Sequence, residues 1–398
     1  MKPAFPGFRF PFQPPFLILA SVAFVSQLTF GLTSTLFALY ARTLGLTVQE
    51  TGITLSALTA GAFLSGPLWG KIADRWGTRR FILAASCIGQ GLFCLLTPLT
   101  ANVLWLTILR FCYGFFLVAQ APVINDLLIN HKNPADQARQ VGTLNIARGV
   151  AFSLGCWLSG YFNEVNPALN FFLASAVAFL VSGTLVFLGG IDRLPATSFP
   201  EKKDKNWLFR KKTLLFFLPI FYRSCAVSAL LFFLPLFWEK SGNNPSFIGM
   251  VIGISNLAQL AFFPIVGRAC FTREKTLMRI IQIGHILSLF PFLIAPLFSR
   301  GWGIFLPQAF MSISWVYFYL GTTIATRKIS VPSRQAEAMG WVETFLNLGG
   351  TLGPAAFSLL LFFTGNSFPA SFLLFSLLIA AAILTSRLSE KSLATPAG

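Results

Sequence analysis

Long apolar runs recur along the whole sequence and leave little room for a fold outside a membrane. An α-helix needs about 20 apolar residues to cross a bilayer. Twelve such runs fall at 16–41, 50–70, 80–98, 102–129, 140–162, 168–190, 213–238, 247–266, 277–298, 303–326, 340–363 and 368–386. Charged residues make up only 11% of the chain, against roughly a quarter in soluble domains. We therefore predict an all-α membrane protein with twelve transmembrane helices.

The basic residues lie mainly on one side of these helices. With the N-terminus placed in the cytoplasm, 24 of the 30 Lys and Arg fall in cytoplasmic segments, and only Arg42, Lys240 and Arg300 fall outside. Cytoplasmic loops of membrane proteins carry this excess of positive charge. The asymmetry predicts a multi-pass protein of the cytoplasmic (inner) membrane with both termini inside. It also explains most of the net charge of +17, so that no nucleic-acid partner is needed.

The two halves of the chain carry matching segments. Residues 133–155 and 331–353 align at a constant offset of 198, which pairs Gly142 with Gly340. A polar, basic segment separates the halves. We therefore predict two pseudo-symmetric six-helix bundles related by an axis normal to the membrane, as in one large class of transporters. The predicted parts are an N-terminal bundle at 1–190, a cytoplasmic linker at 191–212 and a C-terminal bundle at 213–398.

The loop at 70–80, GKIADRWGTRR, is far more charged than the apolar runs on either side of it. Its Lys and Arg fit the orientation rule, but Asp74 does not, because acids contribute little to orientation. Gly70 and Gly77 permit a tight turn and a close approach of helices. We therefore expect Asp74 to pair with an arginine or to cap a helix N-terminus.

This loop resembles the signature between helices 2 and 3 of the major facilitator superfamily, G-x-x-x-D-R-x-G-R-R/K. Thr78 stands where the family often has Arg, which leaves the arginine partner open. The resemblance implies a secondary transporter that works by alternating access, in which this loop packs against the other half and closes the cytoplasmic side. Its implied gating residues are Gly70, Asp74, Arg75, Gly77, Arg79 and Arg80, with Asp126 as an acid at the inner end of helix 4.

A second, weaker resemblance concerns helix 5. Exporters of the family often carry G-P-x-x-G-G there, and this chain has GCWLSG, which keeps Gly155 and Gly160. This favours proton-coupled export of a small organic solute. Uptake of an anionic metabolite, by proton symport or exchange, is the alternative.

Three arginines fall inside apolar runs: Arg110, Arg148 and Arg223. Charges within a membrane are costly and mark functional candidates. No Asp or Glu lies near the middle of a run, so that three arginines facing one cavity would make its field positive. We therefore expect them to bind substrate and to favour an anionic or neutral polar molecule. Bonding to helix carbonyls, or reaching toward the membrane surface, is the alternative role for each.

The remaining polar candidates are few. Gln27, Asn145 and Trp315 are further candidates for substrate binding, and Glu343 and His285 are candidates for proton coupling. Neither the two His nor the six Cys have metal-binding spacing, so we expect no metal and no cofactor. A membrane enzyme would need a deep cluster of acids, His or Cys, and we therefore expect a transporter rather than an enzyme. Its expected partners are a small molecule, the lipid bilayer and protons, and we expect a monomer.

The loop at 70–80 generates the first testable prediction. If Asp74 helps to close the cytoplasmic side, then Asp74→Asn slows turnover while the protein remains folded and inserted. Transport by reconstituted protein, compared at equal amounts of inserted protein, measures the effect. Normal turnover of the variant would remove the gating role.

Overall fold

The computed structural model describes residues 14–76, 79–121, 123–124, 134–187, 211–272, 277–330 and 335–394. The regular elements in these residues are helical. The first half contains α1 (Pro14–Ser34), α2 (Phe37–Thr43), α3 (Val48–Trp76), α4 (Arg79–Leu96), η1 (Thr97–Leu99), α5 (Val103–Leu117), α7 (Pro134–Val165) and α8 (Ala168–Phe187). The second half contains α9 (Lys211–Lys240), α10 (Pro245–Gln259), α11 (Phe262–Thr272), α12 (Leu277–Ile294), η4 (Gly301–Ile304), α13 (Phe305–Ile329), α14 (Gln335–Phe363) and α15 (Phe368–Ala394).

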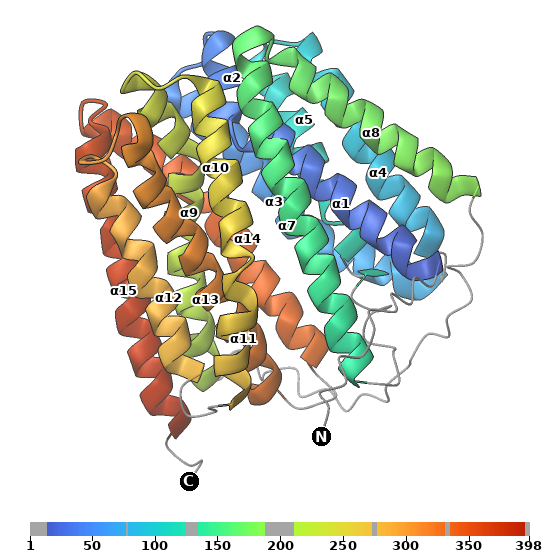
Figure 1. Cartoon of the computed structure of the whole chain (residues 1–398), viewed down its shortest axis with the longest axis vertical. Coiled ribbons are helices and arrows are strands. Elements are labelled where there is room, and N and C mark those ends of the chain that lie inside the picture. Colours follow the sequence, from blue (N-terminus) through green and yellow to red (C-terminus); the bar gives the residue numbers. More distant parts are fainter. Residues whose placement is uncertain are drawn as a thin grey trace, which may run out of the picture.

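These helices account for the twelve predicted crossings. Nine described spans are long and apolar enough to cross a membrane. The other three crossings correspond to α3, α5 and α7, of which α7 has 32 residues and is therefore about 48 Å long at 1.5 Å per residue. The blue-to-green helices of the first half and the yellow-to-red helices of the second half form two bundles side by side (Figure 1). The predicted all-helical fold with two bundles is confirmed. The predicted linker falls largely on 188–210, outside the described residues.

Three predicted runs are interrupted inside their bounds. The run at 102–129 breaks at residues 118–119, after α5 ends at Leu117. The run at 16–41 breaks at residues 35–36, between α1 and α2, next to hydroxyl side chains that bond back to the backbone, such as Thr33 Oγ1 to the Thr29 carbonyl at 2.7 Å. Such back-bonding bends helices. The run at 247–266 breaks at residues 260–261, because the ring of Pro264 is incompatible with a regular turn at the residue four positions before it.

Glycines allow the first helix of each half to approach the fifth very closely. A Cβ atom added to Gly155 on α7 would lie 2.6 Å from the carbonyl oxygen of Leu28 on α1, and one added to Gly31 would lie 3.0 Å from the Gly155 Cα atom. In the second half, a Cβ added to Gly349 on α14 would lie 2.7 Å from the Phe221 carbonyl on α9. Small residues drive helix association in lipid because they let backbones pack closely.

The contact between α1 and α7 predicts a position-specific loss of stability. Gly155→Leu places a side chain where the α1 backbone already lies, and overpacking of this kind costs about 1–3 kcal/mol or more. We expect the melting temperature of the purified protein to fall by several degrees. Gly183→Leu on α8 is the matched control, because a Cβ there meets no atom within 4 Å. Equal effects of the two substitutions would contradict this account of the interface.

Candidate functional site

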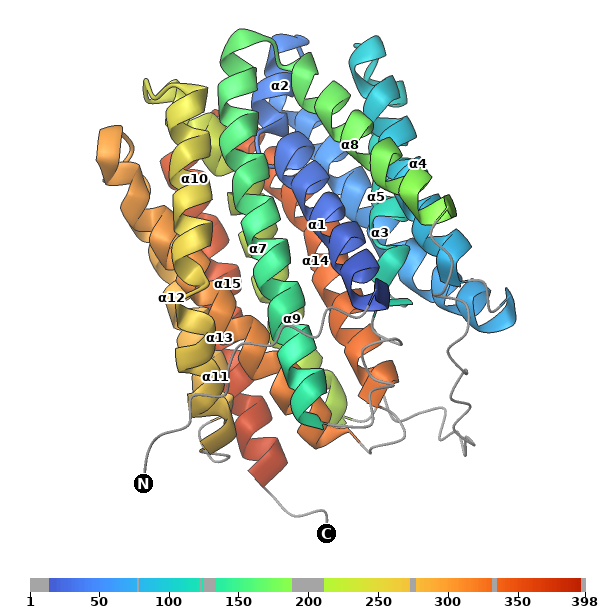
Figure 2. The same cartoon turned by 45° about the vertical axis from the view of Figure 1, so that its right-hand side comes forward.

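The two bundles touch at one end of the molecule. Because the chain crosses twelve times, α1 begins and α15 ends on the same face, here called the terminal face, and the opposite one is the far face (Figure 1). Near the far face, α7 and α10 lie side by side (Figure 2). A Cβ added to Gly160 would lie 3.0 Å from the Cα atom of Gly249, and the backbone N–H of Ser246 donates to Glu164 at 3.1 Å.

A second pair of helices also joins the bundles on this side. The backbone N–H of Ala355 on α14 donates to the hydroxyl of Ser56 on α3 at 3.0 Å. A Cβ added to Gly52 on α3 would lie 2.9 Å from the carbonyl oxygen of Pro354. These contacts hold the halves together at backbone distance along the part of α3 and α14 nearest the far face.

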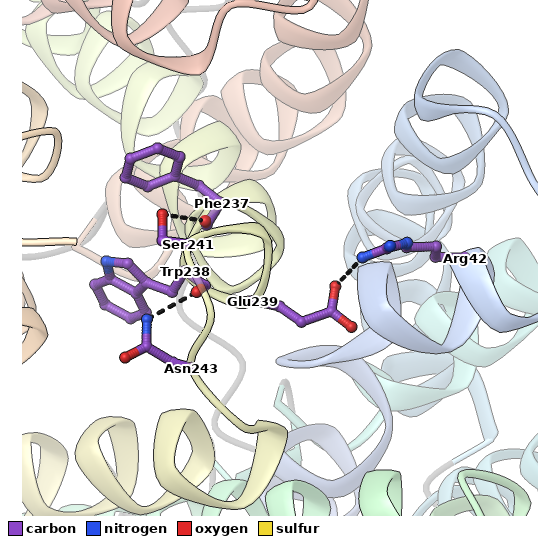
Figure 3. A network of polar contacts seen from close by, with 6 residues as sticks. All are labelled: Arg42, Phe237, Trp238, Glu239, Ser241 and Asn243. Carbon is purple, nitrogen blue, oxygen red and sulfur yellow. Dashed lines mark hydrogen bonds and ion pairs between the residues drawn. The ribbon is translucent and has the colours of Figure 1, made fainter. Parts of the chain in front are cut away.

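One ion pair links the bundles at the far face itself. The guanidinium of Arg42 on α2 donates to the carboxylate of Glu239 at the end of α9, and the two side chains point at each other across the gap between their helices (Figure 3). Asn243 fixes the end of α9, because its amide donates to the carbonyl oxygens of Trp238 and Ser299, both at 2.7 Å. Among the described residues this is the sole ion pair within 4.0 Å. Arg42 and Glu239 are 197 positions apart, close to the repeat offset, but no sequence pattern predicts that they pair.

Toward the terminal face, the packing of α14 against the first half ends. Gly350 packs on α3, where an added Cβ would lie 3.1 Å from Thr59. Glu343 lies two turns earlier on the same side of α14, yet it is exposed. Gly142 and Gly340, which the repeat pairs, are also exposed, and a Cβ on either would meet no atom within 4 Å. At these two positions, α7 and α14 therefore present open space, whereas two turns further along α7 a Cβ added to Gly149 would lie 2.6 Å from Leu260 of the second half.

Glu343 and Arg148 form the charged centre of this region. The half-buried guanidinium of Arg148 on α7 interacts electrostatically with Glu343 on α14 and with Tyr319 on α13. The two charges do not come within the 4.0 Å of an ion pair, and the Nε atom of Arg148 is buried without a hydrogen-bond partner. Asn145, one turn before Arg148, is the repeat counterpart of Glu343 at the offset of 198. We call Asn145, Arg148, Tyr319 and Glu343 the central site.

Arg110 lies elsewhere, inside the first bundle. Its side chain is 1% exposed and donates to the carbonyl oxygen of Thr33 at 3.2 Å and to the hydroxyl of Ser34 at 3.2 Å. Its guanidinium carbon lies 4.1 Å from the ring centroid of Phe37. These three partners flank the break between α1 and α2. Arg110 therefore bonds to the backbone at this break and faces an aromatic ring rather than the central site.

Arg223 has an equivalent setting inside the second bundle. It is 1% exposed, donates to the hydroxyls of Ser288 at 2.9 Å and Ser314 at 3.2 Å, and lies 4.0 Å from the ring centroid of Phe318. His285 lies beside it, fully buried, with neither ring nitrogen hydrogen-bonded. The Arg223 guanidinium carbon also lies 5.8 Å from the ring centroid of Trp315. Arg110 and Arg223 are thus held within separate bundles.

The other predicted residues are distributed as follows. Trp315 on α13 is half-buried and stacks on Tyr319, with ring centroids 5.4 Å apart, so it adjoins the central site. Gln27 is half-buried on α1. Arg80 donates to the carbonyl oxygen of Leu185 on α8 at 2.8 Å, within its own bundle. Gly70 lies inside α3, which continues to Trp76, so the predicted tight turn does not include it. The side chains of Asp74, Arg75 and Arg79, the position Gly77, and Asp126 lie outside what the structure describes.

Two curated relatives align along most of the chain. The Quinolone resistance protein NorA of Staphylococcus aureus (strain MSSA476) is 24% identical over 349 residues, covering 83% of this chain and 86% of the relative. Multidrug resistance protein 2 of Bacillus subtilis (strain 168) is 21% identical over 353 residues, covering 85% and 87%. Both names describe resistance proteins.

Solved structures share the fold. The nucleoside transporter NupG superposes with a TM-score of 0.79 at 15% identity, covering 95% of this chain and 99% of that one. A bacterial homolog of the human lysosomal transporter Spinster, in an inward-facing and unoccupied conformation, has a TM-score of 0.75 at 15% identity, covering 96% and 98%.

The family assignment follows from a match over most of the chain. Residues 19–326 match the family model of the Major Facilitator Superfamily, which agrees with the two-bundle architecture and with the helix 2–3 signature. The chain therefore belongs to the major facilitator superfamily, whose members are membrane transporters and not enzymes.

Proposed function

We propose that this transporter exports a small organic solute from the cytoplasm in exchange for protons, by alternating access. The observation that carries the proposal is the asymmetry between the two faces. The bundles are in backbone contact near the far face, whereas an acid and a cation from different bundles lie unbonded nearer the terminal face. A transporter that exposes its site to one side at a time requires such an arrangement.

The distribution of Lys and Arg supports a cytoplasmic terminal face. On this orientation, the far face is extracellular, and the conformation is closed to the outside with the central site accessible from the cytoplasm. The likeness to the inward-facing Spinster homolog agrees with this assignment. An exporter in this state is ready to take up its substrate.

The direction of transport is proposed from the relatives. Two proteins named for drug resistance align along most of the chain, and a membrane transporter that confers resistance does so by lowering the drug concentration inside the cell. NupG, which is named as a nucleoside transporter, shares the fold and represents the alternative of uptake. Arg110 is bonded within the first bundle, and Arg223 is bonded within the second, where it also lies 5.8 Å from the Trp315 ring centroid. An anionic substrate stays a prediction from the sequence.

Glu343 is the proposed proton carrier. It lies two turns inside α14, between the bundles, and is exposed, so that protons can reach it from the open side. Arg148 on α7 is the charged group that interacts with Glu343, and Arg148 in turn interacts with Tyr319 on α13. His285 is fully buried in the second bundle, which leaves it without access from the central site.

Proton movement in liposomes tests both coupling and direction. With the purified protein and an internal pH dye, we expect norfloxacin, a quinolone, to trigger proton counterflow, and uridine, a nucleoside, to trigger none. In Glu343→Gln the proton signal is lost, and any remaining norfloxacin movement no longer responds to the pH gradient. Glu390→Gln on α15, where the acid bonds to Gln282, is the control. If uridine drives proton entry and norfloxacin gives no response, the protein takes up its substrate and does not export it.

The ion pair at the far face makes a further prediction. Arg42 and Glu239 are 54% and 27% exposed, and such surface pairs contribute about 0.2–1 kcal/mol. We expect Arg42→Gln or Glu239→Gln to shift the equilibrium toward the outward-open state by at most about fivefold, since about 1.4 kcal/mol is tenfold. The reversed pair, Arg42→Glu with Glu239→Arg, restores the original balance.

Spin labels at the exposed positions Ala101 and Arg300, in different bundles, measure this shift as a change in distance distribution. Lys240→Gln is the matched control, because the Lys240 ammonium lies 5.0 Å from the Phe368 ring within its own bundle. If the single substitutions leave the distance distribution unchanged, Arg42 and Glu239 do not help to hold the far face closed.

A further inference from the structure

The central site presents two opposite charges that do not satisfy each other. Arg148 comes from the first bundle and Glu343 from the second, and they interact electrostatically without forming an ion pair within 4.0 Å. Arg148 Nε is buried and has no hydrogen-bond partner. A buried donor or charge without a partner is costly in free energy. The site therefore has unused bonding capacity of both signs.

This pairing decides between classes of ligand. An anion would gain from Arg148 and be repelled by Glu343, and a cation would meet the reverse situation. A molecule that carries both charges gains from both side chains, with its anionic group on the guanidinium and its ammonium on the carboxylate. Charge-assisted hydrogen bonds of this kind are stronger than bonds between neutral groups, and Arg suits carboxylates because it can donate two parallel N–H groups.

An aromatic surface adjoins the two charges. Tyr319 interacts with Arg148 and stacks on Trp315, with an interplanar angle of 18°. Both rings are half-buried on α13. Aromatic side chains favour offset stacking with flat ligands, so the surface suits an aromatic ring carried by the same molecule.

We propose that the central site binds a small aromatic zwitterion, with its carboxylate on Arg148, its ammonium on Glu343 and its ring against Tyr319 and Trp315. This inference rests on the proposed function and names the substrate class for it. It differs from the positive cavity predicted from the sequence, because Glu343 adds a negative charge opposite Arg148. Arg223 lies 5.8 Å from the Trp315 ring centroid, within the second bundle. The bound molecule would also bridge the two bundles, because its two charged groups are held by different halves.

Three indoles that differ in charge test the assignment on the purified full-length protein. Tryptophan is a zwitterion, tryptamine a cation and indole-3-propionate an anion at neutral pH. We expect wild-type protein to bind radiolabelled tryptophan at least about tenfold more tightly than either single-charge probe, since about 1.4 kcal/mol corresponds to tenfold. A wild-type protein without this preference would overturn the proposal.

The variants should change selectivity in opposite directions. In Glu343→Gln, indole-3-propionate should bind as tightly as tryptophan or more so, because the site for the ammonium is gone. In Arg148→Gln, tryptamine should bind as tightly as tryptophan or more so. Arg279→Gln, which changes an exposed cation on α12, should leave the order of the probes unchanged. An equal loss of affinity for all three probes in both variants would indicate a structural role and overturn the assignment.

Charge-conserving variants keep the test decisive if a neutralised protein does not fold. Arg148→Lys and Glu343→Asp should retain the preference for tryptophan, and loss of that preference in folded protein would contradict the assignment. Binding is measured without any gradient, so it is separate from the transport assay. A preference for tryptophan without proton-coupled export leaves the site assignment in place and removes the proposed function. Proton-coupled export without a preference for tryptophan supports the proposed function and removes the site assignment.

Discussion

The free-energy cost of holding a charge away from water determines how this protein uses its three intramembrane arginines. Arg110 and Arg223 meet that cost inside their bundles with hydroxyl groups, aromatic rings and, for Arg110, a backbone carbonyl at a helix break. These partners are neutral, and each arginine is 1% exposed. Arg148 is different, because the charged group with which it interacts, Glu343, belongs to the other bundle. An arginine whose partners all lie in one bundle stabilises that bundle. The interactions of an arginine that faces the other bundle change when the two bundles move relative to each other.

The contacts between helices follow the same division. Along α7, Gly155 packs on α1 within its own bundle, and Gly160 packs on α10 of the other bundle. Lipid provides no hydrophobic drive for either contact, so both depend on close packing and on polar bonds. The contact between α1 and α7 lies within one bundle, and these two helices remain together when the bundles move. The contact between bundles includes a buried apolar cluster to which both halves contribute, such as Phe37 and Phe357, and it carries few polar bonds.

Much of the architecture was predictable, because a bilayer imposes simple rules on length and charge. The twelve crossings follow from apolar run length and the two bundles from the repeat. The helix breaks at 35–36 and 260–261 were not predicted, since both lie inside continuous apolar sequence. The direction in which Arg110 and Arg223 point depends on the rotation of each helix about its axis, which run length does not determine. Glu343 was identified as a candidate, but its proximity to Arg148 depends on how the two bundles dock.

The shared use of Glu343 connects the proposed substrate to the proposed exchange. One carboxylate cannot bind a proton and remain an anionic partner for an ammonium group, so the two ligands compete. Substrate bound from the cytoplasm displaces the proton, and a proton bound from outside displaces the substrate. Exchange then needs no separate relay, provided that the bundles rearrange only when the carboxylate is occupied. Arg148 bears on that condition, because an empty, charged Glu343 is attracted to the guanidinium across the interface, whereas a neutralised Glu343 is not. Coupling and gating would in this way depend on the same pair of charges.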